Sequence, residues 1–175
     1  MLSIPTFERK TTIVEKITVV MRDVVTVDFG VKDDPRRINT IVGDISHFYD
    51  DELDPSLFVK QTEWPEGVVE KEVAIIKAGR NFSDFTQLTE FVDELADFEH
   101  LLFPFLTGVP FWANYLCDDQ GIWRVTITDP RSLRSDADGN LSVPHFDCRF
   151  LFCHFGSRSV DDGWDESTGL LLGCK

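Results

Sequence analysis

One segment near the middle of the chain constrains the fold more than any other, because it alone has the periodicity of an amphipathic helix. Apolar residues recur every three or four positions from Phe85 to Leu102, which is the spacing of one buried stripe on a helix. Asn81 is placed to cap this helix, and Pro104 is placed to end it. We therefore expect one principal helix over about residues 82–102, followed by an apolar connector that packs in the core.

Most of the remaining chain has the composition and alternation of β-strands. Residues 11–29 are dominated by β-branched side chains and predict either a long strand, bent or bulged near Arg22 and Asp23, or two strands joined there. Residues 111–129 predict a hairpin, and residues 141–155 predict one further strand with the most regular alternation in the chain. The sequence thus predicts an α+β fold, with mostly antiparallel sheet(s) of about six to eight strands packed against one principal amphipathic helix.

A chain of 175 residues is long enough to bury a core without a metal or disulfide. We expect a single α+β domain over residues 1–155, in which residues 1–10 form an N-terminal arm. Residues 156–175 are rich in Gly, Ser and Asp and lose the strand periodicity, so they predict a C-terminal tail or docking segment. The short apolar run Leu170–Leu172 would be the part that docks.

The chain is strongly acidic, with 31 acidic residues against 17 Lys and Arg and a net charge of −14. This charge disfavours direct binding to nucleic acid or to an anionic membrane, because both are polyanions. Two interpretations remain open. The carboxylates keep the protein soluble, or they attract a basic partner protein.

Three clusters of acidic residues are the candidate partner-binding sites. The first lies on the face of the expected helix opposite the apolar stripe, where like charges four residues apart repel. The other two carry aromatic residues among the acids, a composition typical of protein contact sites. For Trp164, packing into the protein's own core is an equally good interpretation. The candidate residues are Glu90, Asp93, Glu94, Asp97, Phe48, Tyr49, Asp50, Asp51, Glu52, Asp161, Asp162, Trp164, Asp165 and Glu166.

Motifs for catalysis or metal binding are weak. His145, Cys148, Cys153 and His154 resemble a zinc ligand set, but a strand would place them on opposite faces, and zinc needs four converging ligands. Residues 136–140 resemble the start of a calcium loop, although a hairpin turn explains them better. We find no nucleophile elbow, phosphate loop or dinucleotide fingerprint. We therefore expect no metal and no cofactor.

These observations favour a non-catalytic protein that works through protein–protein contacts as an assembly component, such as a phage or virus structural protein. An acidic inhibitor is the alternative, either a nucleic-acid mimic or an anti-defence or immunity-type protein that blocks a basic site on its target. An enzyme without a readable motif is the third hypothesis. The expected partners are other protein subunits or a basic target protein, without nucleic acid or membrane. The expected location is the cytoplasm or the virion, with reduced cysteines.

Overall fold

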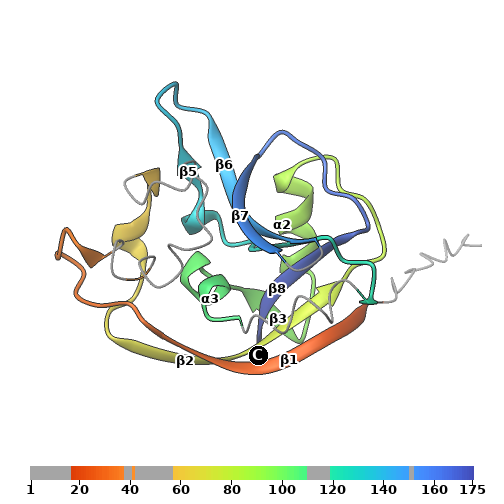
Figure 1. Cartoon of the computed structure of the whole chain (residues 1–175), viewed down its shortest axis with the longest axis horizontal. Coiled ribbons are helices and arrows are strands. Elements are labelled where there is room, and N and C mark those ends of the chain that lie inside the picture. The colour runs from red at the N-terminus through yellow and green to blue at the C-terminus, as the bar shows by residue number, and fades with distance from the viewer. Residues whose placement is uncertain (1–16, 38–40, 42–56, 110–118, 150–151) are drawn as a thin grey trace, which may run out of the picture.

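The computed structural model describes residues 17–37, 41, 57–109, 119–149 and 152–175, with the backbone alone at 148, 149 and 152–154 (Figure 1). Within these residues the chain forms one open sheet of eight strands, most of them antiparallel, with one main helix. The strand order is β1-β2-β8-β4-β6-β5, with β3 paired to β8 and β7 paired to β6. This arrangement confirms the α+β prediction.

The strands are β1 (Thr18–Asp28), β2 (Val68–Lys77), β3 (Phe98–His100), β4 (Arg124–Thr126), β5 (Arg134–Ser135), β6 (Leu141–Arg149), β7 (Phe152–Ser159) and β8 (Thr168–Cys174). The α-helices are α2 (Phe85–Asp93) and α3 (Phe103–Thr107), and two 3₁₀ turns are η4 (Gln61–Glu63) and η5 (Pro130–Ser132).

The two longest strands, β1 and β2, form an antiparallel pair along the lower rim of the molecule in Figure 1. The register shifts between Val19 and Met21, so the irregularity lies just before Arg22 rather than at Arg22 and Asp23. Beyond this point side chains alternate between buried and exposed, which is the pattern that predicted the strand.

The predicted helix over residues 82–102 is wrong in length and in its cap. Helix α2 ends at Asp93, and its N-cap is Asp84, whose carboxylate accepts from the Gln87 backbone N–H at 2.9 Å. Carboxylates gather where the helix stops, and acids are unfavourable at the negative end of a helix. The apolar residues that follow join β3, where Phe98 pairs with Cys174.

Pro104 does not end a helix but lies in the first turn of α3, where the missing proline N–H has no cost. The 3–4 spacing that predicted one helix is therefore shared by α2, the short strand β3 and α3. All three bury their apolar residues in one core.

Residues 141–155 form a hairpin rather than the single strand that their alternation predicts. Phe146 of β6 pairs with Phe155 of β7, and their ring centroids are 5.8 Å apart. Even-numbered residues of β6 therefore lie opposite odd-numbered residues of β7, and β6 is buried on both faces from Val143 to Phe146. Residues 150–151, between the strands, lie outside the described residues. So do residues 111–118 of the other predicted hairpin, and Arg124–Thr126 from its second half pairs with β6 and β8.

Residues 156–175, expected to form a tail or docking segment, contain the end of β7 and the whole of β8. Strand β8 lies inside the sheet, antiparallel to β2 and parallel to β4, and Leu170, Leu171 and Leu172 are fully buried. A Cβ added at Gly169 would lie 3.0 Å from Ile75 Cγ2. The glycine that suggested a loop therefore permits close packing inside a strand.

We expect Leu171→Ala to lower the free energy of unfolding by about 2–5 kcal/mol, because the side chain is fully buried in the sheet. Leu141→Ala, at a leucine that is 37% exposed, is the matched control and should cost less than about 1 kcal/mol. Urea unfolding followed by circular dichroism measures both changes. Equally small effects would mean that residues 156–175 are not part of the cooperative core.

Candidate functional site

The structure joins the two chain segments that carry two of the three acidic clusters. Phe82, just before α2, exchanges backbone hydrogen bonds of 2.7 and 2.8 Å with Trp164, in the connection between β7 and β8. The Phe85 N–H donates to the Val160 carbonyl at 2.9 Å, and the Glu166 N–H donates to the Asn81 side-chain oxygen at 3.0 Å. Figure 1 shows this connection passing beside α2. Segments far apart in the sequence are thus fixed to each other.

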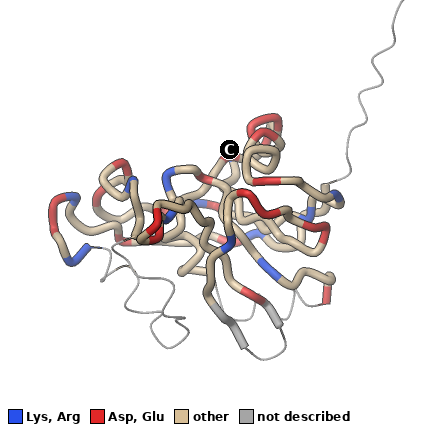
Figure 2. Tube along the Cα trace, turned by 90° about the horizontal axis from the view of Figure 1, so that it is seen from above, with Lys and Arg blue, Asp and Glu red and all other residues tan. Residues whose placement is uncertain are grey.

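We call the exposed carboxylates of these two segments the acidic surface. Its residues are Glu90, Asp93, Glu94, Asp97, Asp161, Asp162, Asp165 and Glu166, all of them exposed. Figure 2 marks acidic and basic positions along the trace in red and blue. The α2 half of the surface lies in a stretch, residues 81–123, without a single Lys or Arg.

Few basic side chains contact the carboxylates of the acidic surface. Asp93 Oδ1 lies 2.9 Å from His100 Nε2, and Asp162 Oδ2 lies 3.9 Å from Arg158 Nε. Within the described part of the chain, the other six carboxylates make no ion pair with a Lys or Arg. The surface therefore presents an excess of negative charge.

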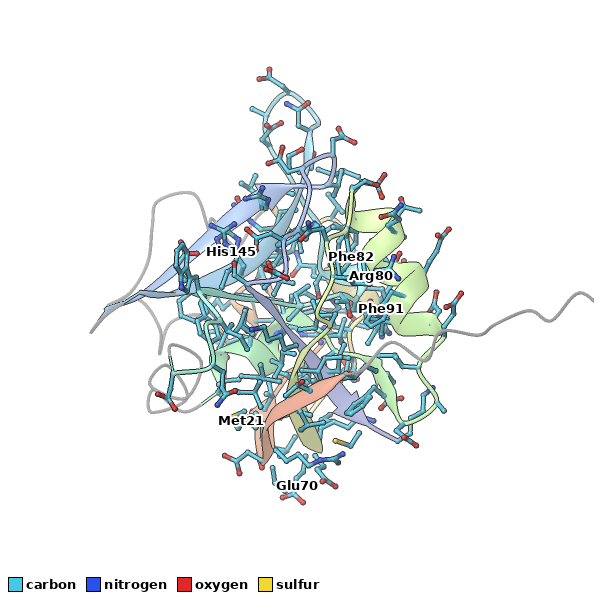
Figure 3. The ribbon with its side chains drawn as sticks, turned by 90° about the vertical axis from the view of Figure 1, so that its right-hand side faces the viewer. Met21, Glu70, Arg80, Phe82, Phe91 and His145 are labelled. Atoms are coloured by element: carbon cyan, nitrogen blue, oxygen red, sulfur yellow. The ribbon has the colours of Figure 1, made fainter. Side chains whose placement is uncertain are left out.

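Buried aromatic side chains pack within the two segments that carry the acidic surface. Figure 3 shows Arg80 beside Phe82 and Phe91, and its guanidinium lies 5.0 and 5.6 Å from the two ring centroids. Trp164 is only 2% exposed, with Arg158 over its ring at 5.5 Å. The hypothesis that Trp164 is an exposed contact residue is therefore wrong, and the alternative, packing into the protein's own core, is what the structure shows.

The third acidic cluster cannot be compared with the structure. Phe48, Tyr49, Asp50, Asp51 and Glu52 lie outside the described residues.

The suggested metal sites gain no support. In the register of β6 and β7, Cys148 stands opposite Cys153 and Asp147 opposite His154, while nothing is described of those cysteine and His154 side chains. Among the described side chains, no group of three His, Cys, Asp or Glu could hold a metal ion.

The calcium-like residues 136–140 form the β5–β6 hairpin turn, as their alternative interpretation predicted. Asp136 accepts from the backbone N–H groups of Asp138 and Asn140, both at 2.9 Å, and from the Asn140 side chain. The Asn140 side-chain hydrogen bond is the main reason that the pKa of Asp136 is lowered.

A polar cluster on β4 and β6 was not found from the sequence. Arg124 pairs with Asp147 across the two strands, Nε to Oδ1 at 2.9 Å, and His145 Nε2 lies 3.7 Å from the same oxygen. Burial lowers the pKa of His145. Burial alone would raise the pKa of Asp147, but the neighbouring His145 ring and the hydrogen bond from Arg124 outweigh it and hold this pKa at about 2. An ionised, paired carboxylate is a poor general acid or base near neutral pH.

Asp93, His100 and Thr128 form a second polar cluster, in which an acid, a histidine and a hydroxyl follow one another as in a hydrolase triad. His100 Nε2 contacts Asp93 at 2.9 Å, and His100 Nδ1 contacts the Thr128 hydroxyl at 2.8 Å. Thr128 is 0% exposed, so its hydroxyl has no access to a substrate. This chain of hydrogen bonds therefore ties the end of α2 to the segment after β4.

The chain matches no family model, no curated protein and no solved structure. In the part of the chain that the structure describes, no helix is long and apolar enough to span a membrane.

We expect Asp147→Asn to remove the contribution that the Arg124–Asp147 ion pair makes to the free energy of unfolding, a contribution that depends on pH in the acid range. Because the folded pKa of about 2 is below the ordinary value of 3.8, the carboxylate stabilises the protein above pH 3.8, and this contribution is lost as pH falls through 2. The variant should lose on the order of 2 kcal/mol at pH 7, and its stability should change less between pH 4 and 2. Urea unfolding across this pH range is the measurement, with the exposed Asp119→Asn as control. Parallel pH profiles for wild type and Asp147→Asn would contradict the assignment.

Proposed function

We propose that this chain is a non-catalytic protein that binds a basic partner protein through its acidic surface. The observation that supports this most is the joining of α2 and the β7–β8 connection by backbone hydrogen bonds at Phe82 and Trp164. Carboxylates from both segments then stand on one fixed framework, largely without cations of their own. A framework that is ordered before binding loses less conformational entropy when the partner arrives.

The acidic residues of α2 contribute little to the stability of their own helix. Glu90 and Glu94 are four residues apart and repel each other, and Glu94 caps the negative end of the helix. A surface that costs stability without supporting the fold is a reasonable place for a partner to bind. Opposite charge on the partner would speed association and make its rate dependent on salt.

The proposal has two forms. In the first, the chain is a component of a larger assembly, such as a phage or virus particle, and the acidic surface contacts a neighbouring subunit. In the second, the chain is an inhibitor whose carboxylates occupy the groove in which a target protein binds nucleic acid. Binding that persists at high salt favours the assembly component, whereas salt-sensitive binding to a nucleic-acid enzyme favours the inhibitor.

Two variants with equal loss of charge test the acidic surface. The acidic-surface variant carries Glu90→Gln, Glu94→Gln, Asp97→Asn and Asp161→Asn. The matched variant carries Asp33→Asn, Glu63→Gln, Glu70→Gln and Asp119→Asn, which are exposed acids elsewhere. Affinity purification from the source organism at low and high salt, with wild type and both variants as bait, is the measurement.

We expect wild type and the matched variant to retain the same basic partner and the acidic-surface variant to lose it. The acidic-surface variant should unfold at the same or slightly higher urea concentration than wild type, because its changes relieve repulsion. Equal retention by all three baits, or equal loss from both variants, would contradict the proposal. A destabilised acidic-surface variant would contradict the separation of binding from folding.

A further inference from the structure

Strand β1 lies at one end of the sheet, and in the described part of the chain no strand pairs with its outer edge. It is the longest strand, and Val24, on its exposed face, is 55% exposed. An open edge of this length carries a row of backbone donors and acceptors that can pair with another strand.

The hydrogen-bonding pattern shows which groups face the open edge. The Phe29 N–H donates inward to the Gly67 carbonyl at 2.8 Å. Because inward and outward groups alternate in an antiparallel pair, the N–H and carbonyl groups of the even-numbered residues 22–28 face outward. The hydrogen bond of the Val24 N–H fits this pattern, since this group donates to the Asp23 side chain at 2.8 Å.

The regular part of the open edge has defined limits. The register shift between Val19 and Met21 interrupts it at one end, and Gly30, with a φ of 62°, turns the chain away at the other. The regular stretch therefore runs from Met21 to Phe29 and is centred on Val25. A two-fold axis at Val25 would pair this whole stretch with the same stretch of a second copy.

Charge complementarity favours this register. With Val25 opposite Val25, Arg22 of each copy stands opposite Asp28 of the other. Both side chains are on the exposed face, and the β-branched Val24 and Thr26 pair between them. Within one chain Arg22 lies 3.6 Å from Glu72, and Asp28 accepts from the Gly30 N–H at 2.8 Å, so pairing across the dimer exchanges or shares these exposed contacts. Opposite charges directly across two strands are stabilising. A register centred on Arg22 would instead place like charges opposite each other.

We propose that β1 pairs antiparallel with β1 of a second copy, so that the protein is a two-fold symmetric dimer with one continuous sheet. The contact closes on itself, because each copy has one β1 edge and the pairing uses both. Asp23 opposes the pairing, since its carboxylate occupies the Val24 N–H and must release it. This inference uses a different surface from the proposed function and does not depend on it.

Val24→Pro tests the edge without changing the β1–β2 ladder. Proline lacks an N–H and is accepted in edge strands where that group faces outward. Wild type should sediment as a dimer in analytical ultracentrifugation, and Val24→Pro should weaken the dimer by about tenfold or more. Val24→Thr keeps the N–H and the β-branched shape and should remain dimeric. Circular dichroism and thermal unfolding confirm that each variant is folded.

A charge swap tests the register. Arg22 also lies 3.6 Å from Glu72 of its own chain, so the swap is made in a Glu72→Gln background. In that background Arg22→Asp and Asp28→Arg should each weaken the dimer, and the double variant should restore it. Arg22 and Asp28 of one copy lie six residues, or about 20 Å, apart along the strand, so they cannot pair within a chain. Asp23→Ala should strengthen the dimer, because it frees the Val24 N–H.

Each contrary result overturns a defined part of the proposal. A wild-type protein that stays monomeric at the highest soluble concentration overturns the dimer. A Val24→Pro protein that remains dimeric assigns the contact to another surface. A double variant as weak as the single variants overturns the register centred on Val25.

Discussion

The fold depends on the close approach of β8 to the strands on both sides of it. This strand, from the last eight residues of the chain, pairs with β2, β3 and β4 and thereby joins β1 and β2 to the β4–β7 half of the sheet. Gly169 favours this approach because it has no side chain: a Cβ there would lie 3.0 Å from Ile75 Cγ2 and 3.1 Å from Ile122 Cγ2, which is tighter than most Cβ contacts. The central pairing joins residues distant in sequence, so the sheet cannot be completed before β8 is in place.

The sequence predicted the class of fold because alternation and β-branching report which residues suit a strand, as in β1 and β2. It did not predict the pairing, because alternation is local. The alternation of apolar residues over 141–155 continues from one strand into the next, so it does not reveal the turn between them. Composition alone also cannot distinguish Gly169 in a packed strand from a glycine in a loop. The helix over residues 82–102 was too long for a related reason. Phe98 and Leu102 fit the helical spacing, but pairing of β3 with β8 places them in other elements.

The sequence predicted which acidic residues are exposed, but it did not predict that the two segments carrying them are in contact. Exposed carboxylates on α2 follow from its apolar stripe, because the opposite face must meet solvent. Their proximity to the β7–β8 connection follows only from the backbone contact between Phe82 and Trp164, which no local pattern indicates. Trp164 shows the same limit. Its neighbours in sequence are polar and acidic, whereas its neighbours in space include the ring-stacking cation of Arg158.

The two proposed surfaces have a combined consequence. If β1 joins two copies, the dimer carries two acidic surfaces related by a two-fold axis. A partner with one basic site would bind each copy independently. A partner that presents basic sites repeatedly, as a multisubunit assembly does, would bind both at once when its spacing matches, because the second contact then forms at a high effective concentration. Loss of the dimer would therefore weaken attachment to a repeating partner far more than attachment to a single basic protein, even with every carboxylate intact.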